Sequence, residues 1–173
     1  MFQRFLTWWQ RRRGRPVVPP FDWLGRIRAL TEAGQWRQAV ISCRYWTREQ
    51  PGNYLAWQQL GEALTKWGVS REIGQGLVAA MAQEGFTARL SSWSSRLDLA
   101  SEEDPLLEAR LAFQQALRLK PDDAASWYGL GEVYHLLGDQ AGGRKIAAIL
   151  QRYDPERAKA LLQQQAQDEP KPT

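Results

Sequence analysis

One pattern of Trp, Leu and Gly constrains the fold of this chain more than any other feature of its sequence. In residues 124–137, large and small apolar residues follow the i, i+3, i+4, i+7 spacing of a single helix face: Trp127, Leu130, Gly131 and Tyr134. Gly138-Asp139 then predicts a tight turn, and a second periodic run ends before Pro155. Because Gly131 has no side chain, another helix can approach it closely. The stretch therefore predicts a helical hairpin with packed inner faces, and Trp127 buried between hairpins.

The same spacing recurs seventy residues earlier, in Trp57, Leu60, Gly61 and Gly68. Pro51 precedes Trp57 by six residues, as Pro121 precedes Trp127. Further in-phase matches divide the chain into frames at 20–53, 54–87, 90–123 and 124–157. A turn is predicted at residues 68–70, with Ser70 as the N-cap of a following helix. The first helix of the third frame is interrupted by serines, so a degenerate helix and an insertion loop both remain open there.

This arrangement resembles the tetratricopeptide repeat, a unit of 34 residues built from two helices. The second helix of the family unit is matched by Ala109, Phe113, Ala116 and Pro121. In the first frame Arg26 and Ile27 replace the family's Leu-Gly pair, and Ile27 should splay that hairpin or mark it as a cap. The resemblance implies an all-α, right-handed α-solenoid of about four hairpins over residues 21–167. A capping helix is expected at 156–167, covering the last hairpin with Ala158, Leu161 and Leu162, and a tail at 168–173.

Residues 1–20 form a basic, aromatic arm with five arginines and no acid, whereas the remaining 18 basic and 19 acidic residues nearly cancel. The arm residues that could contact a membrane or a partner are Phe2, Phe5, Leu6, Trp8, Trp9, Arg11, Arg12 and Arg13. Three interpretations stay open: a partly disordered tail, a helix docked on a partner or on its own solenoid, and a membrane-surface anchor. Nucleic acid is disfavoured as a partner because no basic stripe continues into the body.

The sequence predicts no catalytic chemistry, and hence no enzyme, cofactor or metal site. His135 has no second His or nearby Cys to act with, and Cys43 occupies a helix-packing position. The single cysteine excludes an internal disulfide and slightly favours the cytosol. No apolar stretch approaches the roughly 20 residues of a membrane span, and no signal peptide is apparent. We therefore expect a cytoplasmic protein, which could also be peripheral at a membrane.

In the family that this chain resembles, the first helices of the hairpins line a concave groove that binds a segment of another protein. The corresponding positions here are Leu24, Arg28, Gln58, Glu62, Thr65, Ser94, Asp98, Tyr128, Glu132 and His135. They lack the Lys/Asn/Arg clamp with which some relatives hold a C-terminal carboxylate. The resemblance thus implies a non-catalytic adaptor or assembly subunit whose partner is another protein or a subunit of a larger complex. The alternative is a peripheral membrane accessory protein anchored by its arm.

Overall fold

Seven helices follow one another in the part of the chain that the structure describes. This computed structural model describes residues 21–83 and 104–167, and no strand occurs in these ranges. The helices are α2 (Trp23–Glu32), α3 (Trp36–Glu49), α4 (Tyr54–Gln83), α6 (Pro105–Leu119), α7 (Ala124–Leu136), α8 (Gln140–Leu150) and α9 (Pro155–Gln167). The predicted all-α fold is therefore confirmed.

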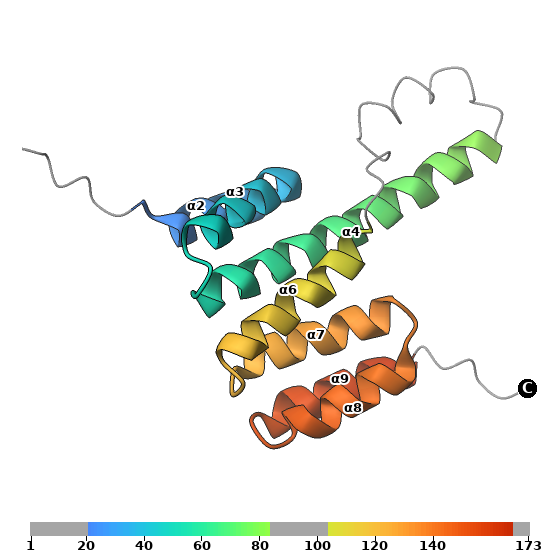
Figure 1. Ribbon diagram of the computed structural model, residues 1–173. Helices are drawn as coiled ribbons and strands as arrows, with labels where there is room; N and C mark the ends of the chain where they lie inside the picture. Colours follow the sequence, from blue (N-terminus) through green and yellow to red (C-terminus); the bar gives the residue numbers. More distant parts are fainter. Residues whose placement is uncertain (1–20, 84–103, 168–173) are drawn as a thin grey trace, which may run out of the picture.

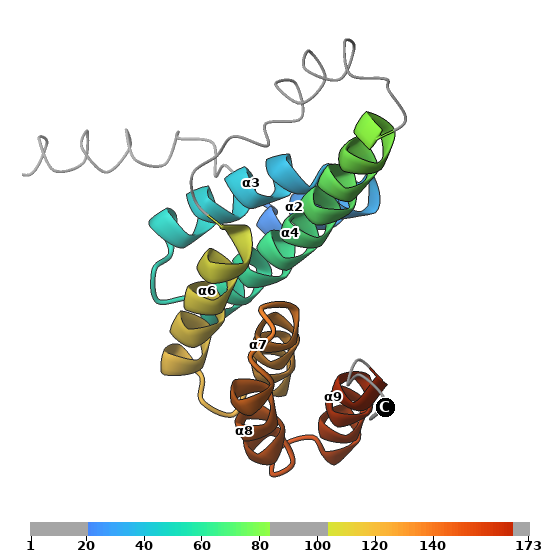
Figure 2. The same ribbon diagram turned by 90° about the vertical axis from the view of Figure 1, so that its right-hand side faces the viewer.

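The helices pack as a row of hairpins. α2 pairs with α3, α4 with α6, and α7 with α8, while α3 also packs on α4 and α6 on α7. α9 covers the last hairpin and contacts both α7 and α8. Figures 1 and 2 show the hairpins stacked side by side, with α2 and α3 at one end and α9 at the other. Each hairpin touches only its neighbours, so the chain is a solenoid of helical hairpins, as predicted.

The turns and helix starts have local causes in the sequence. Gly34 and Gly138 close the first and last hairpins with φ of 68° and 74°, a region that glycine enters without steric cost. The carboxylate of Asp139 accepts a hydrogen bond from the amide of Gly142 at 2.8 Å, which caps α8. α6 begins as predicted, with Asp104 as its N-cap and Pro105 as its first residue.

The predicted turn at residues 68–70 is wrong, because α4 continues through Gly68, Val69 and Ser70 to Gln83. Residues 71–83 therefore do not fold back on the first half of α4, which packs instead against α6. Figure 1 shows the far end of α4 projecting beyond the stack. The described residues contain three hairpins, and the middle hairpin joins α4 to a helix that begins 22 residues after α4 ends. The first helix predicted for the third frame lies outside the described residues.

Close approach at glycines holds the middle of the stack together. Phe113 of α6 is 1% exposed and lies between Gly61 of α4 and Gly129 of α7. A Cβ atom would come within 2.8 Å of the Phe113 ring at Gly61 and within 2.4 Å at Gly129. Gly131, the predicted point of close approach, contacts Leu161 of α9 in the same manner. The absence of these side chains thus sets the spacing between neighbouring helices.

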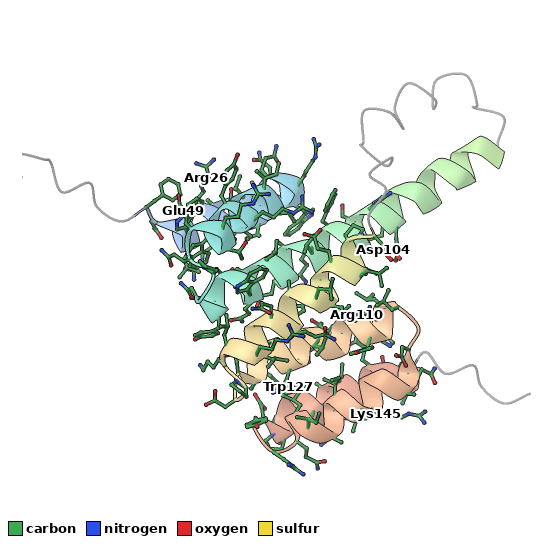
Figure 3. All side chains as sticks on the ribbon, in the orientation of Figure 1. Arg26, Glu49, Asp104, Arg110, Trp127 and Lys145 are labelled. Carbon is green, nitrogen blue, oxygen red and sulfur yellow. The ribbon has the colours of Figure 1, made fainter. Side chains whose placement is uncertain are left out.

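Two sequence expectations need adjustment, and a third, that Ile27 splays the first hairpin or marks it as a cap, stays a prediction. Ile27 itself is 1% exposed and belongs to the core. Trp127 is half-buried, not enclosed, and lies beside the turn between α6 and α7 (Figure 3). In α9, Ala158 and Leu161 are buried as predicted, but Leu162 is 44% exposed.

The Pro-to-Trp spacing of six residues has a direct structural reason. The indole N–H of Trp127 donates to the carbonyl of Pro121 at 2.7 Å, and that of Trp57 donates to the carbonyl of Pro51 at 2.9 Å. Each tryptophan therefore ties the start of its helix to the preceding turn.

Candidate binding groove

The first helices of the three hairpins line a common groove. It has a volume of about 650 Å³ and takes side chains from α2, α4 and α7, with Arg157 of α9 at its border. A second hollow of about 480 Å³ continues it toward Ile73 and Leu136. The two hollows share Trp36, Thr65, Lys66 and Glu132, so they form one continuous surface. We call it the concave groove.

The floor of the groove is apolar and its walls are polar. Ile27, Ala63 and Phe113 lie at the floor and belong to the hydrophobic core beneath it. The walls carry Gln59, Glu62, Lys66, Tyr128 and Glu132. An arrangement of this kind can receive an apolar side chain of a ligand and hydrogen-bond to its backbone or polar groups.

Two carboxylates from neighbouring helices dominate the electrostatics of the groove. Partial loss of hydration raises the pKa of Glu62 on α4 and that of Glu132 on α7. It is the largest effect on the pKa of both carboxyl groups. The positive charge of Lys66 acts on both carboxylates and lowers both pKa values, but it does not outweigh the loss of hydration. Each carboxylate also raises the pKa of its neighbours, Glu62 that of Glu132 and Glu132 that of Tyr128. Lys66 is thus a cation that acts on both carboxylates, Glu62 and Glu132.

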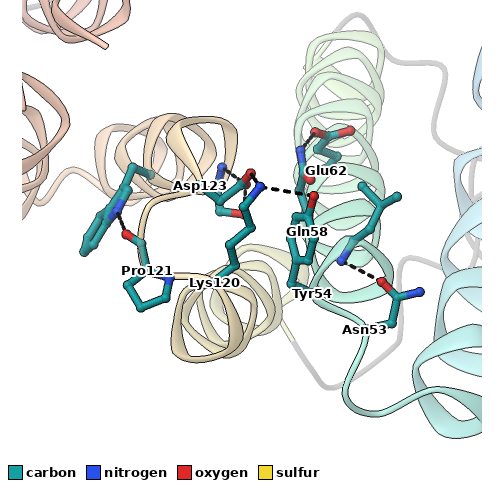
Figure 4. A network of polar contacts seen from close by, with 10 residues as sticks. Asn53, Tyr54, Gln58, Glu62, Lys120, Pro121 and Asp123 are labelled. Carbon is teal, nitrogen blue, oxygen red and sulfur yellow. Dashed lines mark hydrogen bonds and ion pairs between the residues drawn. The ribbon is translucent and has the colours of Figure 1, made fainter. Parts of the chain in front are cut away.

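Hydrogen bonds fix the position of Glu62. The amide of Gln58 donates to one carboxylate oxygen at 3.1 Å, and the amide of Gln59 donates to the other at 2.8 Å. Figure 4 shows the first of these bonds beside a second polar cluster, in which Lys120 reaches the hydroxyl of Tyr54 at 3.3 Å. The carboxylate is therefore held in one orientation while its side chain remains open to water.

The structure brings some of the predicted groove residues together. Glu62, Thr65, Tyr128 and Glu132 all line the groove. Gln58 is only 8% exposed and orients Glu62. Leu24 and Arg28 are exposed on α2 outside the lining, and half-buried His135 also lies outside it. Ser94, Asp98 and all the arm residues fall outside the described part of the chain, so their roles stay predictions.

Sequence reasoning missed several groove residues. Trp36 and Phe113 come from second helices, where the family pattern places packing residues rather than groove residues. Lys66 lies one helical turn beyond the predicted Glu62, and Arg157 lies on the capping helix α9. The i, i+4 spacing of Glu62 and Lys66 on one helix face is a signal that could have found Lys66.

Burial, with a smaller effect of Glu62, raises the pKa of the Cys43 thiol to about 12, so this sulfur stays protonated and unreactive. Among residues 21–83 and 104–167, no group of three or more His, Cys, Asp or Glu side chains could hold a metal ion. None of the helices described is both long enough and apolar enough to cross a lipid bilayer.

A match to a known protein family agrees with the hairpin architecture. A family model described as TPR repeat matches residues 106–138, which cover α6 and α7. A solved structure titled "MamA RS-1 ArsTM double mutant" is similar over 84% of this chain and 96% of its own, with 15% sequence identity and a TM-score of 0.29. No curated protein sequence matches the chain.

Proposed function

We propose that this chain is a protein–protein interaction module that acts as a non-catalytic adaptor or assembly subunit, a proposal supported by the match of residues 106–138 to the tetratricopeptide repeat. In this proposal, a segment of a partner protein binds in the concave groove. The observation that carries it is the continuous surface formed by α2, α4 and α7, with an apolar floor and polar walls.

The lining suits a peptide segment better than a compact small molecule. The groove is open along its length and mixes exposed polar groups with the aromatic surfaces of Trp36 and Tyr128. Aromatic side chains with a polar edge contribute strongly to protein interfaces at a low cost in conformational entropy. We expect the partner segment to lie along the groove, with the arm providing a second attachment.

Capture of the partner from native lysate by the full chain tests this proposal. The groove variant carries Glu62→Lys and Glu132→Lys, which reverse both wall charges. The matched control carries Glu49→Lys and Glu156→Lys, which make the same change of charge at exposed positions outside the groove, Glu49 at the end of α3 (Figure 3). We expect the partner recovered by the wild type to fall at least about tenfold with the groove variant only. Equal recovery by both variants, or no stoichiometric partner with the wild type, would count against the proposal.

A second candidate is a peripheral membrane accessory protein, favoured by the aromatic and basic composition of residues 1–13. Each arginine near an anionic leaflet contributes about 1 kcal/mol of attraction. Association of the full chain with vesicles containing anionic lipid should then drop when residues 1–15 are deleted. Unchanged association would dismiss this candidate without affecting the groove proposal.

A further inference from the structure

The centre of the concave groove is short of positive charge. Glu62 and Glu132 lie on neighbouring helices, and Lys66 acts on both. The remaining charged residues of the lining are Glu32 and Arg157, and Arg157 contacts Asp154 at 3.2 Å. The lining thus holds three carboxylates and two cations, one of which is already paired with Asp154, so another cation near Glu62 and Glu132 would be favourable. The groove therefore fits a ligand that brings arginine or lysine side chains.

The floor of the groove adds a second requirement for its ligand. Ile27, Ala63 and Phe113 provide an apolar base, and Trp36 borders both hollows. A ligand that combines aromatic or aliphatic side chains with cations would match both parts of the surface. Burial of one large apolar side chain on such a floor contributes about 1.5–3 kcal/mol.

This chain carries a segment with that composition. Its arm contains five arginines and no acid, and four aromatic residues lie within its first nine positions: Phe2, Phe5, Trp8 and Trp9. The arm continues directly into α2, whose residues Ile27, Thr31 and Glu32 line the groove. The positively charged arm and the groove that is short of positive charge are therefore joined by a short stretch of chain.

The connection is long enough. Residues 14–21 can span about 25 Å when extended. Ile27 of α2 lines the same hollow as Glu62 and Glu132, so the arm ends about two helical turns before the groove lining begins. A tether of this length gives the arm an effective concentration on the order of millimolar at the groove. A contact with a dissociation constant well below millimolar would then keep the groove occupied.

We propose that the arm, residues 1–20, docks into the concave groove of the same chain, with Arg11 to Arg13 placed against Glu62 and Glu132. A partner segment must displace the arm before it can bind. The docking itself does not depend on the proposed function, whereas the competition with a partner rests on it.

Cross-linking within the full chain tests the docking without any partner. Gln10→Cys places a thiol in the arm, and Ala125→Cys places one in the groove lining on α7. Native Cys43 is buried and its thiol stays protonated, so it does not compete. The matched control pairs Gln10→Cys with Leu111→Cys, an exposed position on α6 outside the concave groove. A short bis-maleimide is added to dilute protein, and the linked peptides are identified by mass.

We expect the arm-to-groove link to form within one chain, at a yield at least about fivefold above that of the control pair. Adding Glu62→Gln and Glu132→Gln should reduce the yield to the control level while the circular dichroism spectrum stays unchanged. Equal yields in the two pairs would mean an undirected arm and would overturn the proposal. Linked dimers would assign the arm to the groove of a second copy, and no link together with vesicle binding would assign it to a lipid surface; each outcome would also overturn it. Partner capture by the groove variants is measured separately, so it can fail while the cross-link succeeds.

Discussion

At the scale of single residues, glycines determine how closely the helices pack. Phe113 fills the space that Gly61 and Gly129 leave open, and Leu161 does the same at Gly131. The sequence indicated this role for Gly131 from its place in the helix face. It could not indicate it for Gly129, because that glycine contacts a residue from the preceding hairpin and thus depends on how hairpins stack.

Gly129→Ala should lower the free energy of unfolding by about 1–2 kcal/mol. The added methyl group would lie 2.4 Å from the ring of Phe113, which is buried and cannot move freely. This overpacking costs about 1–3 kcal/mol and exceeds the gain of up to about 1 kcal/mol in helix propensity. Urea unfolding measures the change, with Gly52→Ala as the control because no atom lies within 4 Å of its new methyl group. Similar losses in both variants would contradict the packing role of Gly129.

Glu132 should make the chain less stable as the pH rises through the acidic range. Loss of hydration raises the pKa of this carboxyl in the folded state, so the folded chain holds the proton to a higher pH than the unfolded chain does. The free energy of unfolding then falls from the ordinary glutamate pKa, about 4.3, up through the raised value. Glu132→Gln should remove this fall and stabilise the chain at pH 7 by less than about 1 kcal/mol, with no gain at pH 3. Unfolding curves at several pH values test this, and exposed Glu49→Gln is the control; a lower stability of Glu132→Gln at pH 7 would refute it.

At the scale of helices, most elements were predictable and α4 was not. Gly68 and Gly138 occupy the same place in the pattern, but only Gly138 is followed by a capping residue, Asp139. The predicted cap, Ser70, lies one residue farther from its glycine and falls inside α4. The second frame matched the family pattern in its first helix, through Trp57. The third frame matched it in its second helix, through Phe113, so the two frames together supplied one complete hairpin pattern. Packing between residues far apart in the sequence decides which helix pairs with α4. No local sequence pattern contains this information.

Ser70→Pro distinguishes a continuous α4 from a turn at this point. In a continuous helix, proline removes a hydrogen bond and clashes with the preceding turn, at a cost of about 3 kcal/mol or more. At the start of a second helix it would be tolerated. Urea unfolding and far-ultraviolet circular dichroism measure the effect. Glu156→Pro is the control, because that exposed residue lies in the first turn of α9. A loss no larger than that of the control would restore the predicted turn.

At the scale of the whole molecule, residues 21–83 and 104–167 form a solenoid of three hairpins, and residues 84–103 separate the two helices of the middle one. Arg44 of α3 forms a two-pronged ion pair with Glu108 of α6, with Nε 3.0 Å from one carboxylate oxygen, so the first and middle hairpins are also linked by charge. The groove follows from this arrangement, because it needs α2, α4 and α7 side by side. α4 and α6, the helices on either side of residues 84–103, pack directly against each other.

Removing residues 69–103 should therefore leave a folded solenoid. Joining Gly68 to Asp104 gives the middle hairpin a Gly-Asp turn like that of Gly138-Asp139, followed by the capped start of α6. Shortening the connection from about 35 residues to a few gains roughly 2 kcal/mol in loop-closure entropy, which offsets the packing that residues 69–83 contribute to the full chain. We expect one cooperative urea transition and a free energy of unfolding within about 1 kcal/mol of the full chain. Removal of residues 155–173 is the contrasting deletion, because it takes away buried Ala158 and Leu161 and should destabilise the last hairpin. If the shortened chain is unfolded while the contrasting deletion is tolerated, residues 69–103 are part of the folding core and the middle hairpin is not an interrupted repeat.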